Sequence, residues 1–252
     1  MRDLAERVYF ALCLALGRLL RSAKYSHTDI VRENSEHRIR KRRLGYAPLL
    51  VWLAGPLAKI LNTGVRVLPQ RDWEQRERGI YASLYGASIR IDANGALVLP
   101  LLAGTTLAAL LEDPKLDEST RTVAIDRAVI ALAEFHRVGF THGDAMAENV
   151  LVDLDAGVAR WFDFETIHDP ARPMAWRRAD DVRALLVTCL TRTAAEKLAE
   201  TVHLILDQYH DEDVTPLVSD SFRSVWQRPL PFHLAQAGLS LDAFRAIDRS
   251  SR

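Results

Sequence analysis

The chain has 252 residues, of which 48% are apolar and 26% charged, and this composition excludes collagen-like, low-complexity and fully disordered proteins. Its 33 basic and 33 acidic residues cancel, but the first 50 residues hold eleven Arg and Lys against five Asp and Glu, so they carry +6 and the remainder −6. A basic leading segment favours an anionic partner (phosphate, lipid headgroup or nucleic acid), or is simply a solvated charged face.

The two cysteines, Cys13 and Cys189, lie far apart within apolar surroundings, and no Cys or His cluster has zinc-ligand spacing. We therefore expect a reducing compartment, the cytoplasm. The apolar stretches 8–17 and 46–61 fall short of the about 20 apolar residues that a membrane-spanning helix needs. A basic amphipathic helix is instead predicted at 3–22, either packed on its own domain or lying on an anionic membrane surface.

The elements predicted in the first 103 residues mix helices with strands. Asn94-Gly95 between apolar runs is typical of a hairpin turn, and Gly86 ends a helical pattern. In chain order, the predicted elements are a helix at 3–22, strands at 25–32 and 37–43, an apolar insert near 44–66, a helix at 70–85, and strands at 88–92 and 96–101.

From residue 104 onward the pattern is mainly helical, with one further hairpin. The predicted elements are helices at 106–111 and 118–138, strands at 150–153 and 158–162, and helices at 180–190, 193–209, 217–226 and 231–248. Strands first and helices after are typical of an α+β protein. We therefore predict an α+β fold with a small mixed part, 1–103, and a helical part, 104–252.

Three side chains with hard oxygen atoms are predicted at one end of the hairpin in the helical part. Asp144 lies on an irregular segment after the long helix, Asn149 follows at the start of a strand, and the second strand leads into Asp163. Carboxylate and amide oxygens suit Mg²⁺, which completes its shell with phosphate oxygens and water. One acid is then left to orient or deprotonate a hydroxyl, as phosphoryl transfer requires.

These residues resemble the protein-kinase-like superfamily, in the atypical and small-molecule branch that includes aminoglycoside phosphotransferases, lipopolysaccharide sugar kinases and RIO-type kinases. His142-Gly143-Asp144, followed by Asn149, is similar to the HGD form of the catalytic loop. Asp163-Phe164-Glu165 resembles the metal-binding DFG triplet, with Glu in place of Gly, and Asp181 resembles the residue that anchors the catalytic-loop backbone. The resemblance is strongest over 130–190.

The resemblance implies a two-lobed fold. Residues 1–103 would form a small, divergent N-lobe with the amphipathic helix and the apolar insert, and 104–252 a helical C-lobe with the catalytic loop. It implies Asp144 as catalytic base, Asn149 and Asp163 as Mg²⁺ ligands, and Asp181 as structural support. His142 would brace the loop, although its ordinary pKa of about 6.5 also suits a general acid or base.

The resemblance also implies that the helix at 70–85 supplies a glutamate, Glu74 or Glu77, which pairs with a lysine that contacts the ATP phosphates. We favour Lys41 because the end of a strand gives its side chain a fixed direction, and Lys59 in the apolar insert is the alternative. A glycine-rich phosphate loop is not visible. The segment 26–29 occupies its place, where backbone N–H groups and hydroxyls would substitute for it.

The segment 98–104 resembles the last N-lobe strand and the hinge that binds adenine through backbone groups. By this resemblance the groups are the carbonyl of Pro100 and the N–H of Leu102. Proline is tolerated at the first position because only its carbonyl is used. The alternative interpretation is an apolar core strand.

We therefore expect an ATP- and Mg²⁺-dependent phosphotransferase that acts on a hydroxyl acceptor. The acceptor is a bacterial cell-envelope glycolipid sugar or a Ser/Thr side chain, and residues 1–65 would contact an anionic membrane on its inner face. The missing glycine-rich loop leaves an alternative, a non-catalytic pseudokinase or binding protein at the membrane. No nucleic-acid partner is expected, because no nucleic-acid-binding module is visible.

Overall fold

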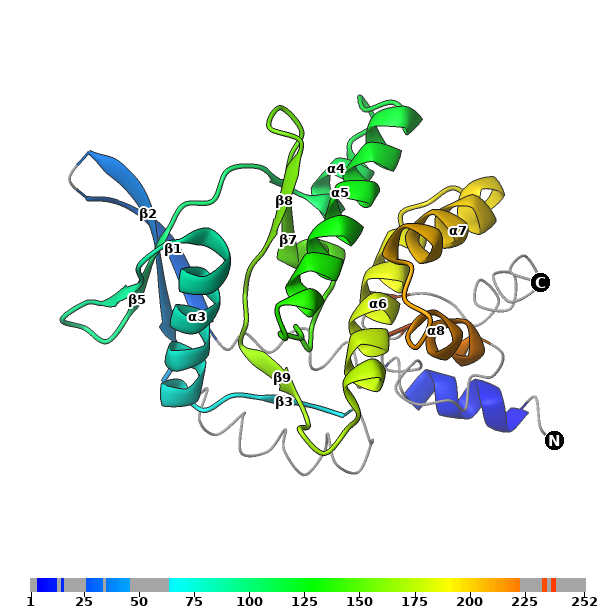
Figure 1. The fold of residues 1–252 in the computed structure, drawn as a ribbon, viewed down its shortest axis with the longest axis horizontal. Coiled ribbons are helices and arrows are strands. Elements are labelled where there is room, and N and C mark those ends of the chain that lie inside the picture. The colour runs from blue at the N-terminus through cyan, green and yellow to red at the C-terminus, as the bar shows by residue number, and fades with distance from the viewer. Residues whose placement is uncertain are drawn as a thin grey trace.

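The computed structural model describes residues 4–12, 15, 26–33, 35–45, 64–222, 233–234 and 237–238. Helices occur there together with antiparallel strands, so the predicted α+β class is confirmed. Figure 1 shows a sheet with one helix beside it, a central unit of strands and helices, and a further group of helices on the far side.

The first sheet has four antiparallel strands in the order β1 (Ser26–Glu33), β2 (Glu36–Arg43), β5 (Leu97–Pro100) and β4 (Arg90–Ile91). β1 and β2 pair along their whole length, which confirms the first predicted hairpin. β4 and β5 confirm the second, although β4 is shorter than the prediction at 88–92.

Helix α3 (Gln70–Tyr85) has the predicted bounds and lies beside this sheet (Figure 1). It ends at Gly86, which adopts a left-handed conformation with φ 58° that glycine tolerates best. Because side chains alternate along a strand, Ile39 and Lys41 share the face of β2 that looks toward α3. The fully buried ring of Trp73 on α3 lies under Lys41, 5.2 Å from its ammonium group.

The central unit contains a three-stranded antiparallel sheet with the order β6 (Thr105–Thr106), β7 (Val150–Asp153) and β8 (Val158–Trp161). Helices α4 (Leu107–Glu112) and α5 (Glu118–Arg137) pack against it. Asp117 caps α5 by accepting a hydrogen bond from the N–H of Thr120 at 2.7 Å. The predicted helices and hairpin of this region are confirmed.

The far group comprises α6 (Met174–Leu190), α7 (Leu198–Tyr209) and α8 (Thr215–Ser221). α6 is buried at every residue from 179 to 190, so it runs through the core. It begins at residue 174 rather than at the predicted 180, because Arg177 and Arg178 interrupt the apolar pattern after Trp176.

The sequence does not predict the paired strands β3 (Val65–Val67) and β9 (Thr166–His168), nor the two-residue β6. β3 takes the place of the last residues of the expected insert near 44–66, which is a correction to the prediction. Strands of two or three residues are too short to show an apolar alternation.

The predicted N-terminal helix at 3–22 is helical at 4–12 and at 15 in the described part of the chain. Its remainder, the insert residues 46–63 with Lys59, and most of the predicted helix at 231–248 lie outside the described residues. No helix in the described ranges has both the length and the apolar character needed to cross a membrane.

A continuous cluster of buried side chains joins the sheet to the helical part. The ring of Phe164 stacks on Phe135 of α5, with centroids 5.4 Å apart, and meets Tyr81 of α3 edge-on at 6.1 Å. These three rings fix α3 against the central unit, immediately beside Asp163.

Candidate active site

A buried carboxylate holds the backbone of the loop between α5 and β7. Asp181 of α6 accepts hydrogen bonds from the backbone N–H of His142 at 2.7 Å and of Gly143 at 2.8 Å. His136 contacts the same carboxylate at 3.0 Å. Burial opposes ionisation, but His168 and His136 together lower the pKa of Asp181 below its usual value. The carboxylate is therefore ionised and keeps the loop in place.

Gly143 allows this loop to approach β9 closely. Its φ of 84° lies in the left-handed region, and a Cβ atom there would stand 3.0 Å from Thr166 Oγ1 and 3.2 Å from the nitrogen of Ile167. A side chain at this position would therefore be strained and would push β9 away from the loop.

His142 uses both ring nitrogens inside the protein. Nε2 lies 2.9 Å from the carbonyl of Phe162 and donates to it, while Nδ1 accepts from the N–H of Asp144 at 3.3 Å. Burial lowers the pKa of His142 to about 4, so the ring is neutral near pH 7. This geometry favours the brace over the general acid or base, because it leaves neither nitrogen for a substrate.

Asp144 and Asn149 form one hydrogen-bonded unit at the end of the loop. The amide nitrogen of Asn149 donates to the backbone carbonyl of Asp144 at 2.8 Å and to its carboxylate at 3.0 Å. Burial and the negative charge of Asp163 raise the pKa of Asp144 to about 7, against the opposing effects of His233 and Asn149. A carboxylate with this pKa suits a general base near neutral pH.

Asp163 follows β8 with a φ of 67°, a left-handed conformation that few residues other than glycine adopt. The next residue, Phe164, is fully buried in the core, and its N–H donates to Glu77 at 3.2 Å. The left-handed turn thus lets the chain bury Phe164 while the carboxylate of Asp163 faces Lys41, 2.6 Å away.

Lys41 lies among three carboxylates at the junction of β2, α3 and the central unit. Its ammonium group is 2.6 Å from Asp163, 2.8 Å from Glu165 and 3.6 Å from Glu77. Burial disfavours the charge, but these carboxylates outweigh it and hold the pKa of Lys41 above its usual value. The cluster therefore contains one positive charge and up to three negative charges.

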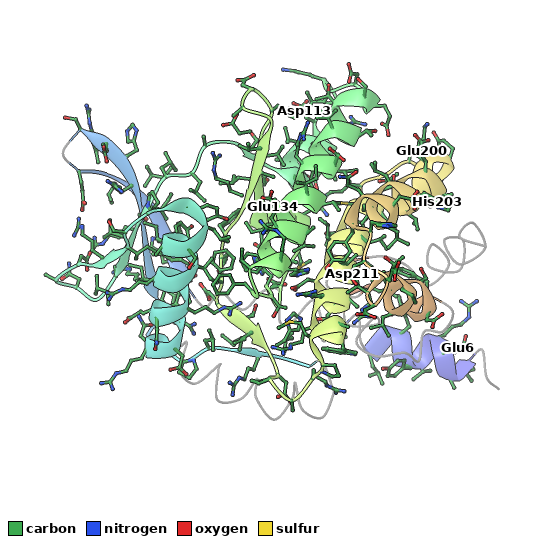
Figure 2. The ribbon with its side chains drawn as sticks, viewed as in Figure 1. Glu6, Asp113, Glu134, Glu200, His203 and Asp211 are labelled. Atoms are coloured by element: carbon green, nitrogen blue, oxygen red, sulfur yellow. The ribbon has the colours of Figure 1, made fainter. Side chains whose placement is uncertain are left out.

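The structure distinguishes the two candidate glutamates. Glu77 contacts Lys41, and the ring N–H of Trp73 holds its carboxylate at 3.1 Å. Glu74 instead accepts a hydrogen bond from Gln70 on the same helix and does not join the cluster. Figure 2 draws the described side chains as sticks on the ribbon and labels Glu134 on α5. The alternative lysine, Lys59, lies outside the described residues.

The predicted adenine-binding groups lie on the connection between the two parts of the molecule. Pro100 is the last residue of β5, opposite Arg38 of β2, and Leu102 lies in the irregular segment before β6 (Figure 1). The segment 26–29 lies in β1, paired with β2, and is not a loop. The segment expected to replace a phosphate loop is therefore an edge strand rather than a loop, and β2 pairs with one edge of its backbone.

Two residues at the site have roles that the sequence analysis misses. Glu165, the third carboxylate near Lys41, is visible in the sequence only as a departure from glycine in the DFG triplet. Arg76, adjacent to Glu77 on α3, donates a hydrogen bond to the carbonyl of Thr141, immediately before His142. No sequence signal identifies that contact, because it depends on how α3 packs.

A second buried polar cluster lies behind the loop. Asp180 of α6 is 3.1 Å from His168, 3.0 Å from His233 and 3.1 Å from Arg183. Burial alone would raise its pKa, but these positive or polar neighbours hold the pKa of Asp180 well below the usual value. Through His233, this cluster connects the C-terminal segment to α6, the helix whose Asp181 anchors the loop.

Within the described residues, no group of three or more His, Cys, Asp and Glu side chains is arranged to hold a metal ion. The predicted Mg²⁺ ligands are only two residues, Asn149 and Asp163. Asn149 is an amide and is not among the four residue types of such a group. In comparisons with known proteins, no family model and no curated protein matches this chain.

Proposed function

We propose that the chain is an ATP- and Mg²⁺-dependent phosphotransferase with a protein-kinase-like, two-lobed fold, in which 1–103 form the N-lobe and 104–252 the C-lobe. The observation that carries this proposal is the direct contact of Lys41 with Asp163, 122 positions away, beside the Asp144–Asn149 pair. The charge of Asp163 acts on Asp144, so the two pairs belong to one site. Phosphoryl transfer depends mainly on such positioning and charge neutralisation.

The oxygen atoms at this site fit a hard divalent cation. The amide nitrogen of Asn149 is engaged by two oxygens of Asp144, which leaves Oδ1 as the atom for a cation. Asp163 supplies a carboxylate. These two residues would hold Mg²⁺, which would supply positive charge to neutralise the phosphates of ATP.

Side chains of the protein would carry out the other steps, which are proton transfer, phosphate binding and support of the loop. Asp144 orients the acceptor hydroxyl and takes its proton, for which a pKa of about 7 is suitable. Lys41 binds phosphate oxygens, and Glu77 keeps its side chain in position. His142 stays neutral and braces the loop.

The acceptor that we favour is a hydroxyl of a small molecule or of a cell-envelope glycolipid sugar, with a Ser/Thr side chain as the other class. The segment between Glu165 and α6 is short, and β9 ties it to β3. It therefore lacks the length of a regulated loop that would present a peptide substrate. The free, buried thiol of Cys189 and the need for ATP suit the cytoplasm.

A non-catalytic binding protein is the second candidate, and two observations favour it. Three carboxylates already surround Lys41, and β1 occupies the expected place of a phosphate loop. A protein that binds partners without turnover would retain a lysine whose charge is already paired inside the protein.

The test is transfer of phosphate from radiolabelled ATP to an extracted cell-envelope glycolipid fraction. Asp144→Asn should reduce turnover by about 10²–10⁴-fold while nucleotide binding persists, because it removes only the general base. The matched control is Asp155→Asn in the exposed β7–β8 turn, which should retain full turnover. Full activity of Asp144→Asn would exclude the catalytic assignment, and absence of transfer by the unmodified protein to sugars and to proteins would favour the binding protein.

A further inference from the structure

One peptide unit of the loop between α5 and β7 is bound from both sides of the candidate site. Its N–H, which belongs to His142, donates to Asp181 of α6 at 2.7 Å. Its carbonyl, which belongs to Thr141, accepts a hydrogen bond from the guanidinium of Arg76 on α3. Figure 1 shows α3 and α6 on opposite sides of the central unit. Two helices that lie apart therefore hold the two polar atoms of the same peptide unit.

Holding both polar atoms of this peptide unit fixes the direction of the chain that follows it. The unit is planar, so its N–H and its carbonyl cannot rotate independently. Asp144 comes two residues after His142, and Gly143 between them has a left-handed φ of 84°. A rotation of the unit 141–142 would therefore redirect the carboxylate of Asp144.

Arg76 and Glu77 are consecutive residues of α3, and they serve the two sides of the site. Successive residues of an α-helix are about 100° apart around its axis, so their side chains leave in different directions. Glu77 lies 3.6 Å from Lys41, while Arg76 reaches the loop. The position of α3 thus sets Lys41 relative to Asp144.

The guanidinium of Arg76 is a charged donor at a buried acceptor. Burial lowers the pKa of Arg76, and the negative charges of Asp181 and Glu77 oppose this effect. Arginine stays protonated at neutral pH, because its ordinary pKa is above about 12. Thr141 is buried, so its carbonyl would lose a donor that water does not readily replace.

Other contacts hold α3 against the central unit without Arg76. The hydroxyl of Tyr85 donates to the carbonyl of Trp161 at 2.6 Å, and the N–H of Phe164 donates to Glu77 at 3.2 Å. Buried apolar side chains of α3 add to these contacts. Loss of the Arg76 hydrogen bond should therefore release the loop and leave α3 in place.

We propose that Arg76 is a positioning residue, which fixes the peptide unit 141–142 and so keeps Asp144 aligned with Lys41. Arg76 acts through the backbone of the loop, because its hydrogen bond ends on the carbonyl of Thr141. Its effect on turnover rests on the proposed phosphotransfer, whereas its effect on the loop does not.

The first test is amide hydrogen exchange of the full chain without nucleotide, read by mass spectrometry of peptides that contain 141–144. Arg76→Met removes the donor and keeps an aliphatic side chain. It should speed exchange in these peptides about tenfold or more, because the loop loses a hydrogen bond from a charged group. The matched control is Tyr85→Phe, which removes a hydrogen bond from the same helix to another backbone carbonyl. It should leave exchange at 141–144 unchanged.

The second test is steady-state phosphotransfer by the same variants, with kcat expressed per folded molecule as measured by circular dichroism. Arg76→Met should lower kcat about tenfold or more, because the base is misplaced. The KM for ATP should stay within about twofold, because Lys41 and Glu77 remain in place. Arg76→Lys should recover part of the lost kcat, because it restores a charged donor on a shorter side chain.

Unchanged exchange at 141–144 in Arg76→Met would overturn the proposal, as would faster exchange throughout the chain, which would make the contact merely structural. An unchanged kcat in a variant whose loop exchanges faster would also overturn it. Absence of transfer by the unmodified protein would instead contradict the proposed function, and the exchange result alone would then decide whether Arg76 fixes the loop.

Discussion

The two sides of the candidate site are held by different kinds of contact. On the sheet side, side-chain ion pairs surround Lys41, at 2.6 Å from Asp163 and 2.8 Å from Glu165. On the helical side, the carboxylate of Asp181 binds the backbone of His142 and Gly143 directly. Ion pairs of Lys41 can be exchanged for phosphate oxygens by side-chain movement alone, whereas the loop cannot move without breaking buried backbone hydrogen bonds. Under the proposed function, the loop is built in advance, and Lys41 would exchange its carboxylate partners for phosphate when nucleotide binds.

The largest expected effect concerns the loop side. Asp181→Ala leaves two backbone N–H groups and His136 without their buried acceptor, so the free energy of unfolding should fall by about 3–5 kcal/mol in a urea titration. The control is Asp207→Ala at an exposed position of α7, which should change it by less than about 0.5 kcal/mol. A loss for Asp181→Ala as small as that of the control would mean that the loop is not anchored as described.

The pH dependence of stability tests the helical side of the site, where His142 braces the loop. The ring of His142 has its pKa lowered from about 6.5 to about 4 by burial, so between these values the unfolded chain binds more protons than the folded one. The contribution of His142 is complete above about pH 6.5 and is lost as the pH falls toward 4. Over this window it amounts to at most about 3 kcal/mol.

The check is urea unfolding of the unmodified protein and of His142→Gln across this range. The stability advantage of the unmodified protein should narrow as the pH falls, because glutamine does not titrate. An advantage that stays constant with pH would show that His142 is not held as a neutral brace.

The smallest expected effect concerns the sheet side. Glu165→Gln removes one of the carboxylates that compete with phosphate for Lys41, so binding of Mg²⁺ and ATP should tighten a few-fold in calorimetry. The control is Glu134→Gln on the exposed face of α5, which should leave the affinity unchanged. Weaker binding by Glu165→Gln would contradict exchange at Lys41 and would make Glu165 part of the cation site.

The sequence predicts those parts of the fold that have a local signal. The hairpin of β1 and β2, helix α3 with its end at Gly86, and the turn at Asn94-Gly95 all follow from periodicity and turn residues. β3 and β9 could not be found in this way, because each exists only through pairing with a segment far along the chain. The first turns of α6 are missed for a different reason, since Arg177 and Arg178 interrupt the apolar pattern that follows Pro173.

In the candidate site, too, features with a local sequence signal can be predicted, and features that depend on distant contacts cannot. The spacing of Asp144, Asn149 and Asp163 is visible in the sequence, because local elements place them. The choice between Glu74 and Glu77 needs the rotation of α3 about its axis, which only packing of Trp73 and Phe164 fixes. The sequence alone therefore identifies the residues of the loop, but it does not identify all the residues that surround Lys41.

The measurement that tests the central claim most directly is the melting temperature of the protein with Mg²⁺ alone, with ATP alone and with both. Ligand at a hundredfold excess over its dissociation constant stabilises the folded state by about 2.7 kcal/mol. We expect a clear rise that requires both ligands and disappears in Asp163→Asn but persists in the exposed control Asp207→Asn. No rise at saturating nucleotide, or an equal rise in Asp163→Asn, would contradict a metal–nucleotide site at this junction.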